Sequence, residues 1–177
     1  MGRGRTDMKC TSAEAAKMIR KFTEERRALL MREQKCKMFN AALGEDIETV
    51  RPAYDFAAMQ ADIAAVEEKI RRVKHAINVF NTTTAVPGFD MTIDEVLVYL
   101  PQLTETKDRL SEMAAVLPKT RAGLGGFMNN ASVIDYEYAN YVPEDAEAAL
   151  EAVSDRLAAV QTALDLVNST VQMDIDL

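Results

Sequence analysis

Apolar residues recur in alternating steps of three and four along three long stretches of this chain. The stretches span residues 56–80, 93–117 and 150–171. A mean step of 3.5 residues places each series on one narrow stripe of an α-helix, the seam by which helices supercoil around each other. The members are Phe56, Met59, Ile63, Val66, Ile70, Val73, Ile77 and Phe80; Ile93, Val96, Leu100, Leu103, Lys107, Leu110, Ala114 and Leu117; and Leu150, Val153, Leu157, Val160, Leu164, Val167 and Val171. Lys107 is the only charged member, so each stretch predicts a long helix that packs along an apolar seam.

Local signals predict an additional helix before these three. They also predict where the next helix starts. Thr11 and Glu14 have the spacing of a capping box, which predicts that the first helix begins at residue 11 or 12. Gly44 suits the left-handed turn that often follows a helix, so we expect this helix to end there. Asp55 is suited to cap the second helix, which should run to about Phe80.

Similar signals set the bounds of the third and fourth helices. Thr92 and Glu95 form a second capping-box pattern, and Pro118 is expected to end the helix that they open. Pro101 lies one or two turns inside that helix, where it removes a backbone hydrogen bond and should produce a kink. Pro143 suits the first position of the fourth helix.

Residues 132–141 break the helical pattern. Ile134, Tyr136 and Tyr138 alternate with more polar or smaller residues, which is typical of a half-buried strand. A lone strand needs a partner. The glycine-rich stretch before it, the run 82–86, or the same strand of another subunit could supply one.

Together these elements predict an all-α fold. We expect a long antiparallel helical hairpin within a four-helix bundle, with coiled-coil-like seams and a short β-like insert near residues 132–141. The chain has 177 residues, enough for a substantial core, so we expect a single helical domain over residues 1–177. Within it, residues 1–11 are expected to form a flexible basic N-terminus and residues 119–142 a glycine-rich connector with a strand-like segment.

Charge is distributed unevenly along the chain. Residues 1–43 hold 11 Lys and Arg against 5 Asp and Glu, whereas the chain as a whole has a net charge of −7. The simplest interpretation is that the basic first helix lies against acidic segments of its own chain or of a neighbour. A nucleic-acid surface is the alternative, although acidic residues such as Glu24, Glu25 and Glu33 interrupt the basic ones.

Composition also predicts a compartment. No window approaches the roughly 18 uninterrupted apolar residues that a membrane span needs, and the basic start has no apolar run behind it to make a signal peptide. We therefore expect a soluble cytoplasmic protein with no membrane partner. Cys10 and Cys36 lie too far apart along one helix to pair, so both are expected to be free thiols, with Cys36 in a packing role.

The chain holds a single histidine, which excludes several kinds of site. A ferritin-type metal centre needs two Glu-x-x-His units, and a zinc site needs more than two cysteines and one histidine. His75 falls at the outermost position of the second helix, where we expect it to be exposed and unsuited to nucleophilic catalysis. We therefore expect no catalytic residues, no metal and no cofactor.

One polar pattern remains as a candidate site. The second and fourth helices both end in an Asn-Ser/Thr-Thr sequence at the same position relative to their seams. If these helices run parallel around an antiparallel third helix, both ends meet beside the cap of the third helix. These groups could cap the helix ends or form a polar pocket. The candidate ligand-binding residues are Asn78, Asn81, Thr82, Thr92, Asn168 and Thr170.

The same segments resemble a known family. The pairs Ile77-Asn78 and Asn81-Thr82, the helix opening Met91-Thr92-Ile93, and a last helix that ends near an Asn before Asp176-Leu177 are similar to the septicolysin-like family of small bacterial helical proteins. The resemblance covers residues 56–177. It implies an all-helical, oligomeric, cytoplasmic protein of unestablished activity, and it transfers no catalytic residue.

These observations favour a non-enzymatic, self-associating helical protein that acts as a scaffold or adaptor. The first helix carries charges such as Glu25 and Arg32 where its seam should continue, so it is expected to pack over part of its length or to contribute to a homo-oligomer interface. A partner protein is also compatible with this pattern. The alternative is a module that binds a small polar ligand or nucleic acid through the Asn/Thr ends or the basic first helix.

Overall fold

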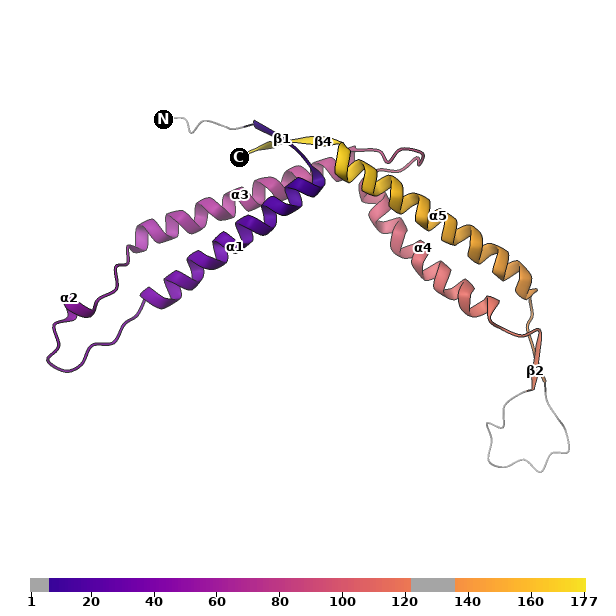
Figure 1. Cartoon of the computed structure of the whole chain (residues 1–177), viewed down its shortest axis with the longest axis horizontal. Helices are drawn as coiled ribbons and strands as arrows, with labels where there is room; N and C mark the ends of the chain where they lie inside the picture. The colour runs from indigo at the N-terminus through magenta and orange to yellow at the C-terminus, as the bar shows by residue number, and fades with distance from the viewer. Residues whose placement is uncertain (1–6, 122–135) are drawn as a thin grey trace, which may run out of the picture. The chain divides into compact units, whose positions relative to one another are not determined.

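A computed structural model describes residues 7–121 and 136–177, most of which are helical (Figure 1). The helices are α1 (Ser12–Cys36), α2 (Ile47–Val50), α3 (Phe56–Thr83), α4 (Ile93–Ala114) and α5 (Pro143–Thr170). The strands are β1 (Asp7–Thr11), β2 (Lys119–Arg121), β3 (Tyr136–Tyr138) and β4 (Gln172–Asp176). None of the helices in the described part is long and apolar enough to cross a membrane.

Contacts divide the chain into two compact units, where the sequence favours a single domain. Unit 1 comprises residues up to 84 together with 166–177, and unit 2 comprises residues 85–165. In unit 1 the main helical contact is between α1 and α3. Unit 2 holds α4 and most of α5, whose last turn is assigned to unit 1.

The core of unit 1 lies along the predicted seam of α3. Met59, Ile63, Val66, Val73 and Phe80 are all buried there. Helix α1 buries only Ala15 completely, as expected for a stripe interrupted by charges. The two helices are also joined by an ion pair between Arg26 and Glu67, with 2.6 Å between Nε and Oε1. The basic first helix therefore does contact an acidic residue of its own chain.

Helix α1 begins as predicted and ends earlier. Thr11 accepts a hydrogen bond from the Glu14 backbone and Glu14 accepts one from the Thr11 backbone, which confirms the capping box. The helix stops at Cys36, not at Gly44, because the apolar residues beyond it find no surface to pack on. Met38 and Leu43 are 79% and 108% exposed. Gly44 does adopt a left-handed conformation, with φ of +88°, in the loop before α2.

The first and last strands pair with each other, and neither was predicted. Strand β1 is antiparallel to β4, with Lys9 opposite Asp174 and Cys10 opposite Met173. Cys10, Met173 and Ile175 are buried, and β4 packs on α3. Residues 7–11 are therefore an ordered strand and not part of a flexible N-terminus, while residues 1–6 lie outside the described residues.

Unit 2 contains α4 and α5 up to Asp165, and these helices run side by side in Figure 1. Helix α4 begins at the Thr92 capping box, contains Pro101 and ends before Pro118, as predicted. Near its other end the Tyr141 hydroxyl donates to the backbone oxygen of Met113 at 2.9 Å. The buried side chains of the two helices are Ile93, Val96, Leu103, Ala146, Val160, Leu164 and Val167, of which only Val167 lies on the part of α5 assigned to unit 1.

The strand expected at residues 132–141 is present as Tyr136–Tyr138. It is antiparallel to β2, with Lys119 opposite Tyr138, so its partner is the segment just before the glycine-rich stretch. All three residues of β3 are exposed, which contradicts the half-buried alternation that we expected. Each strand has only three residues, and among the described elements the contacts of β2 and β3 are with each other. The rest of the stretch from 122 to 135 lies outside the described residues.

Candidate functional site

The structure places the predicted site residues at helix ends, where their hydroxyls contact their own helices. The Thr82 hydroxyl donates to the backbone oxygen of Asn78 at 3.0 Å. The Thr170 hydroxyl donates to the backbone oxygen of Leu166 at 2.6 Å. Asn78 is exposed and Asn81 is half-buried. These hydrogen bonds agree with the helix-end interpretation of the Asn/Thr sequences.

The remaining two candidates lie in different units. Asn168 is half-buried near the end of α5, in unit 1 with the residues above. Thr92 belongs to unit 2, where it caps α4. Its backbone and hydroxyl both donate to Glu95, at 2.7 and 2.9 Å, and these hydrogen bonds lower the pKa of the Glu95 carboxyl. The polar groups of Thr92 and Glu95 thus form hydrogen bonds with each other.

A groove lies directly beside the predicted site, between the end of α3 and strand β4. It has a volume of about 730 Å³, within the usual range for ligand sites, and lies entirely within unit 1. None of the six candidate residues lines it, but their sequence neighbours do, so the end of α3 and the segment after α5 meet here. The lining residues of this α3–β4 groove are Arg72, His75, Ala76, Val79, Phe80, Thr83, Thr84, Val171, Gln172, Met173, Asp174 and Asp176.

The groove combines an apolar floor with charged walls. Val79 is 47% exposed and Phe80 and Met173 are buried beside it. On the α3 side, Arg72 pairs with Glu68 at 2.7 Å and approaches Asp176 Oδ1 at 3.5 Å. His75 is exposed, as the heptad register predicted. The arrangement offers apolar contact together with hydrogen bonds and charge, which suits binding of a molecule with both characters.

Sequence reasoning missed this groove because it did not identify β4. A signal was present: Met173 and Ile175 alternate with Gln172, Asp174 and Asp176, the period of a strand with one buried face. Five residues are too few to stand out beside helical seams several times longer.

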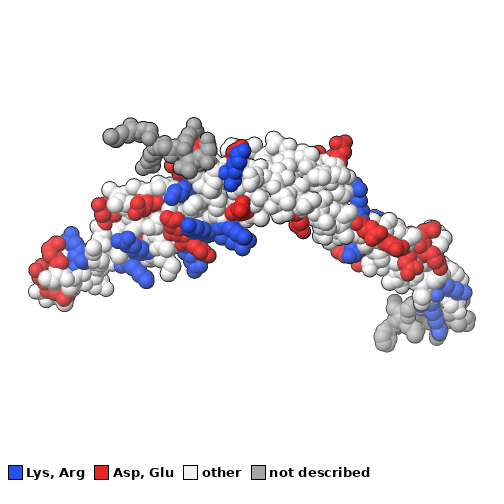
Figure 2. All heavy atoms as spheres, turned by 45° about the horizontal axis from the view of Figure 1, so that its top comes forward, with Lys and Arg blue, Asp and Glu red and all other residues white. Residues whose placement is uncertain are grey.

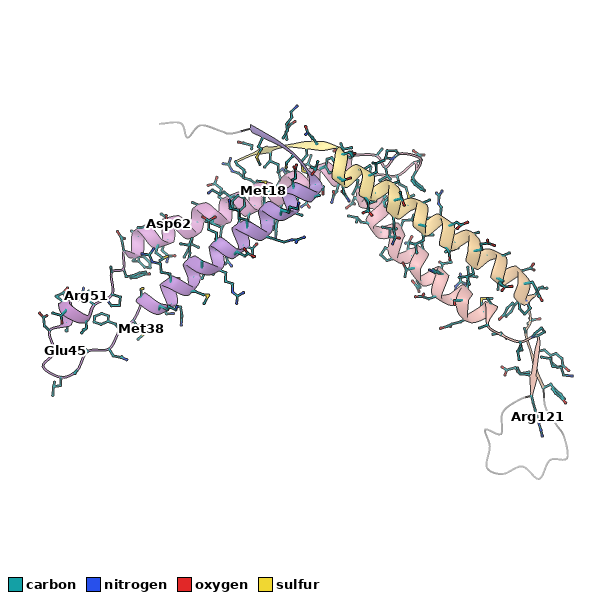
Figure 3. The ribbon with its side chains drawn as sticks, viewed as in Figure 1. Met18, Met38, Glu45, Arg51, Asp62 and Arg121 are labelled. Carbon is teal, nitrogen blue, oxygen red and sulfur yellow. The ribbon has the colours of Figure 1, made fainter. Side chains whose placement is uncertain are left out.

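A second exposed surface lies at the connection between α1 and α3. We call it the hairpin tip and define it by four exposed apolar residues, Met38, Leu43, Ile47 and Phe56. Figure 3 shows Met38 with Glu45 and Arg51 in this connection. The tip also carries an ion pair between Arg51 and Glu48 at 2.9 Å.

Two titratable groups outside the groove, Cys10 and Tyr54, have shifted pKa values. No cluster of three or more metal-ligating His, Cys, Asp or Glu side chains is found among residues 7–121 and 136–177. Burial raises the pKa of the Cys10 thiol, and the charge of Glu14 raises it further. Burial and the nearby Glu33 carboxylate raise the pKa of Tyr54, whose hydroxyl donates to Glu33 at 3.3 Å.

Surface charge on α1 is mixed. On the face shown in Figure 2, basic and acidic side chains alternate over the α1–α3 hairpin, at the left, without a continuous basic stripe. Lys69 of α3 lies over the Phe22 ring, 5.6 Å from its centroid, so this aromatic ring already has a cationic neighbour.

Comparison with known proteins identifies a similar fold. A solved structure of a functionally unknown conserved protein from Corynebacterium diphtheriae matches with a TM-score of 0.55 and 12% identity. The match covers 94% of this chain and 99% of the other. No family model and no curated protein matches the chain. The chain is thus similar in fold to a bacterial protein that is described as functionally unknown.

Proposed function

We propose that this protein is a non-enzymatic, self-associating helical protein that acts as a scaffold or adaptor in the cytoplasm. The observation that carries the proposal is the hairpin tip. Leu43 is 108% exposed, Met38 79% and Phe56 67%, so large apolar side chains gather in one connection with no surface of unit 1 covering them. Exposed apolar patches of this kind mark sites of protein association.

A second copy of the chain is the partner that we propose for the tip. Each unit is built on a helical pair, and two hairpins that pack together form the four-helix arrangement with coiled-coil-like seams that the sequence predicts. Half-buried residues of α1 such as Leu29 and Leu30 lie on the way to the tip and can extend such an interface. The septicolysin-like resemblance, which implies an oligomeric protein, supports the same proposal.

Native mass tests the proposal. Light scattering of the full chain at micromolar concentration is expected to show a discrete homo-oligomer without bound nucleic acid. Met38→Ser combined with Leu43→Ser is expected to give a monomer with unchanged helical circular dichroism, because both side chains are exposed and add nothing to the core.

A matched control comes from unit 2. Val116 and Leu117 are also exposed apolar neighbours outside any helix, at 42% and 63%. Val116→Ser combined with Leu117→Ser should leave the oligomer intact. A wild-type monomer would refute self-association, and an oligomer that survives the tip substitutions would refute the role of the tip.

The alternative is a binding module, and the α3–β4 groove is the observation that favours it. The groove holds Arg72, His75 and Asp174 around an apolar floor, beside the predicted Asn/Thr ends. Mass spectrometry of the native protein distinguishes the two functions, since a co-purified small molecule or nucleic acid supports the module and a ligand-free oligomer supports the scaffold.

A further inference from the structure

We propose that the α3–β4 groove binds an extended peptide segment of a partner protein, which adds to the outer edge of β4 as a third strand and carries alternating apolar and basic residues. This inference goes beyond self-association and uses a surface different from the hairpin tip. Its basis is a strand edge that no other described strand covers, an apolar floor beside that edge, and the charge of β4.

No described strand covers the outer edge of β4, and only its last residue, Asp176, is held there by Arg72. Within the described residues β4 pairs only with β1, so the sheet has two strands and each has one outer edge. Arg72 donates to the backbone oxygen of Asp176 at 3.5 Å, which places that oxygen on the α3 side, away from β1. Backbone groups of alternate residues in an antiparallel strand point the same way, so those of Asp174 and Gln172 also face the groove. Exposed edges of this kind are templates for strand addition.

The floor of the groove fits the inward side chains of such a strand. Val79 is 47% exposed on α3, and Ala76 and Phe80 line the groove with it. Side chains on one face of a strand recur at every second residue. Alternate apolar residues of the added strand therefore rest on Val79 while their backbone pairs with β4.

The charge of β4 determines which outward-facing side chains the added strand should carry. Its solvent-facing residues include Asp174, and the observed ladder already shows what this position accepts, because Lys9 of β1 lies directly opposite it. Strand β1 is itself an alternating sequence, with Met8 and Cys10 on either side of Lys9. We infer that the partner strand has the same character. Antiparallel pairing of β4 with a second β4 would instead place acidic side chains opposite one another, which is unfavourable.

A binding assay on the full chain tests this inference. The probe is a short fluorescent peptide of alternating lysine and valine, capped at both ends, and the readout is fluorescence polarisation. We expect saturable binding, weaker binding of the glutamate-for-lysine peptide, and loss of binding when a central valine of the probe is replaced by proline, which lacks the backbone donor.

Two variants locate the site. Asp174→Lys reverses one cross-strand charge and should weaken binding about threefold to tenfold. Val79→Ser removes apolar floor and should also weaken it. Asp62→Lys is the matched control: Asp62 is an exposed carboxylate of the same helix α3, and Figure 3 shows it toward the end of α3 that lies away from β4. It makes the same change in net charge and should leave binding unchanged.

The outcomes are decisive in both directions. Equal affinity for the lysine and glutamate peptides, equal affinity for the proline peptide, or equal loss in the Asp174→Lys and Asp62→Lys variants would overturn the proposal. A lower native mass of the Asp174→Lys variant would show that a second copy occupies the edge and would overturn it too. Because self-association is tested at Met38 and Leu43, failure of one proposal leaves the other intact.

Discussion

At the scale of single residues, the two cysteines have different surroundings. Cys10 is 4% exposed in β1, and burial followed by the charge of Glu14 raises the pKa of its thiol. Cys36 is half-buried at the end of α1. Because the thiolate is the reactive form, a buried thiol of raised pKa reacts slowly.

We predict that iodoacetamide alkylates Cys36 at least about tenfold faster than Cys10 in the native protein, since Cys10 reacts only when β1 opens. Peptide mass spectrometry over time measures both rates. In denaturant the two rates should converge, and Cys36→Ser should leave only the slow phase. Equal native rates would mean that β1 is not stably paired.

Residue-level signals were also the most predictable part of the chain. The capping boxes at Thr11 and Thr92 and the cap at Asp55 all form the hydrogen bonds expected of them. Each joins residues three apart, so its geometry follows from the first helical turn alone. The candidate site at Asn81 and Thr82 was read from the same helix-end chemistry, and in the structure the Thr82 hydroxyl contacts its own helix.

At the scale of elements, β4 is the strand on which the α3–β4 groove depends. Ile175 is 1% exposed, and together with Met173 it forms the apolar face of β4. Shortening the Ile175 side chain would leave a cavity and remove contacts that hold the sheet on α3. The effect should be that of a core substitution even though the strand lies near the end of the sequence.

We predict that Ile175→Ala lowers the free energy of unfolding of unit 1 by about 2–4 kcal/mol. Urea denaturation followed by circular dichroism measures the change. Ile47→Ala is the matched control, because Ile47 is 51% exposed, and it should cost less than about 1 kcal/mol. A similar loss of unfolding free energy in the two variants would show that Ile175 of β4 is not part of the core of unit 1.

Helices and strands differed in how well the sequence predicted them. The seam of α3 repeats over many turns and contains every residue that α3 buries, although its first member, Phe56, is exposed. Strands β1 and β4 each have five residues and depend on a partner at the other end of the chain. The sequence also predicted the wrong end for α1. A glycine such as Gly44 favours the turn that ends a helix, but it does not make the helix extend that far.

At the scale of the whole molecule, the division into two units predicts separate responses to mutation. Val73 is fully buried in unit 1, and Leu103 is 6% exposed in unit 2. Regions that open independently show independent hydrogen exchange. Each substitution should therefore act mainly within its own unit.

We predict that Val73→Ala speeds amide exchange in α1, β1 and β4, with little change in α4. Leu103→Ala is the reciprocal variant and should speed exchange in α4 with little change in α1. Hydrogen exchange with mass spectrometry measures both. If either variant speeds exchange equally in both units, the chain unfolds as one cooperative body.

The sequence by itself determined where the helices begin and which faces they bury, because caps and heptads join residues a few positions apart. It also determined that His75 is exposed, through the same register. Only the tertiary structure decided that the two ends of the chain pair and that β4 lies along α3. Those contacts join segments far apart in sequence, and their stability comes from the buried side chains of Cys10, Met173 and Ile175, whose partner strand no local pattern identifies. The groove exists because of that long-range pairing.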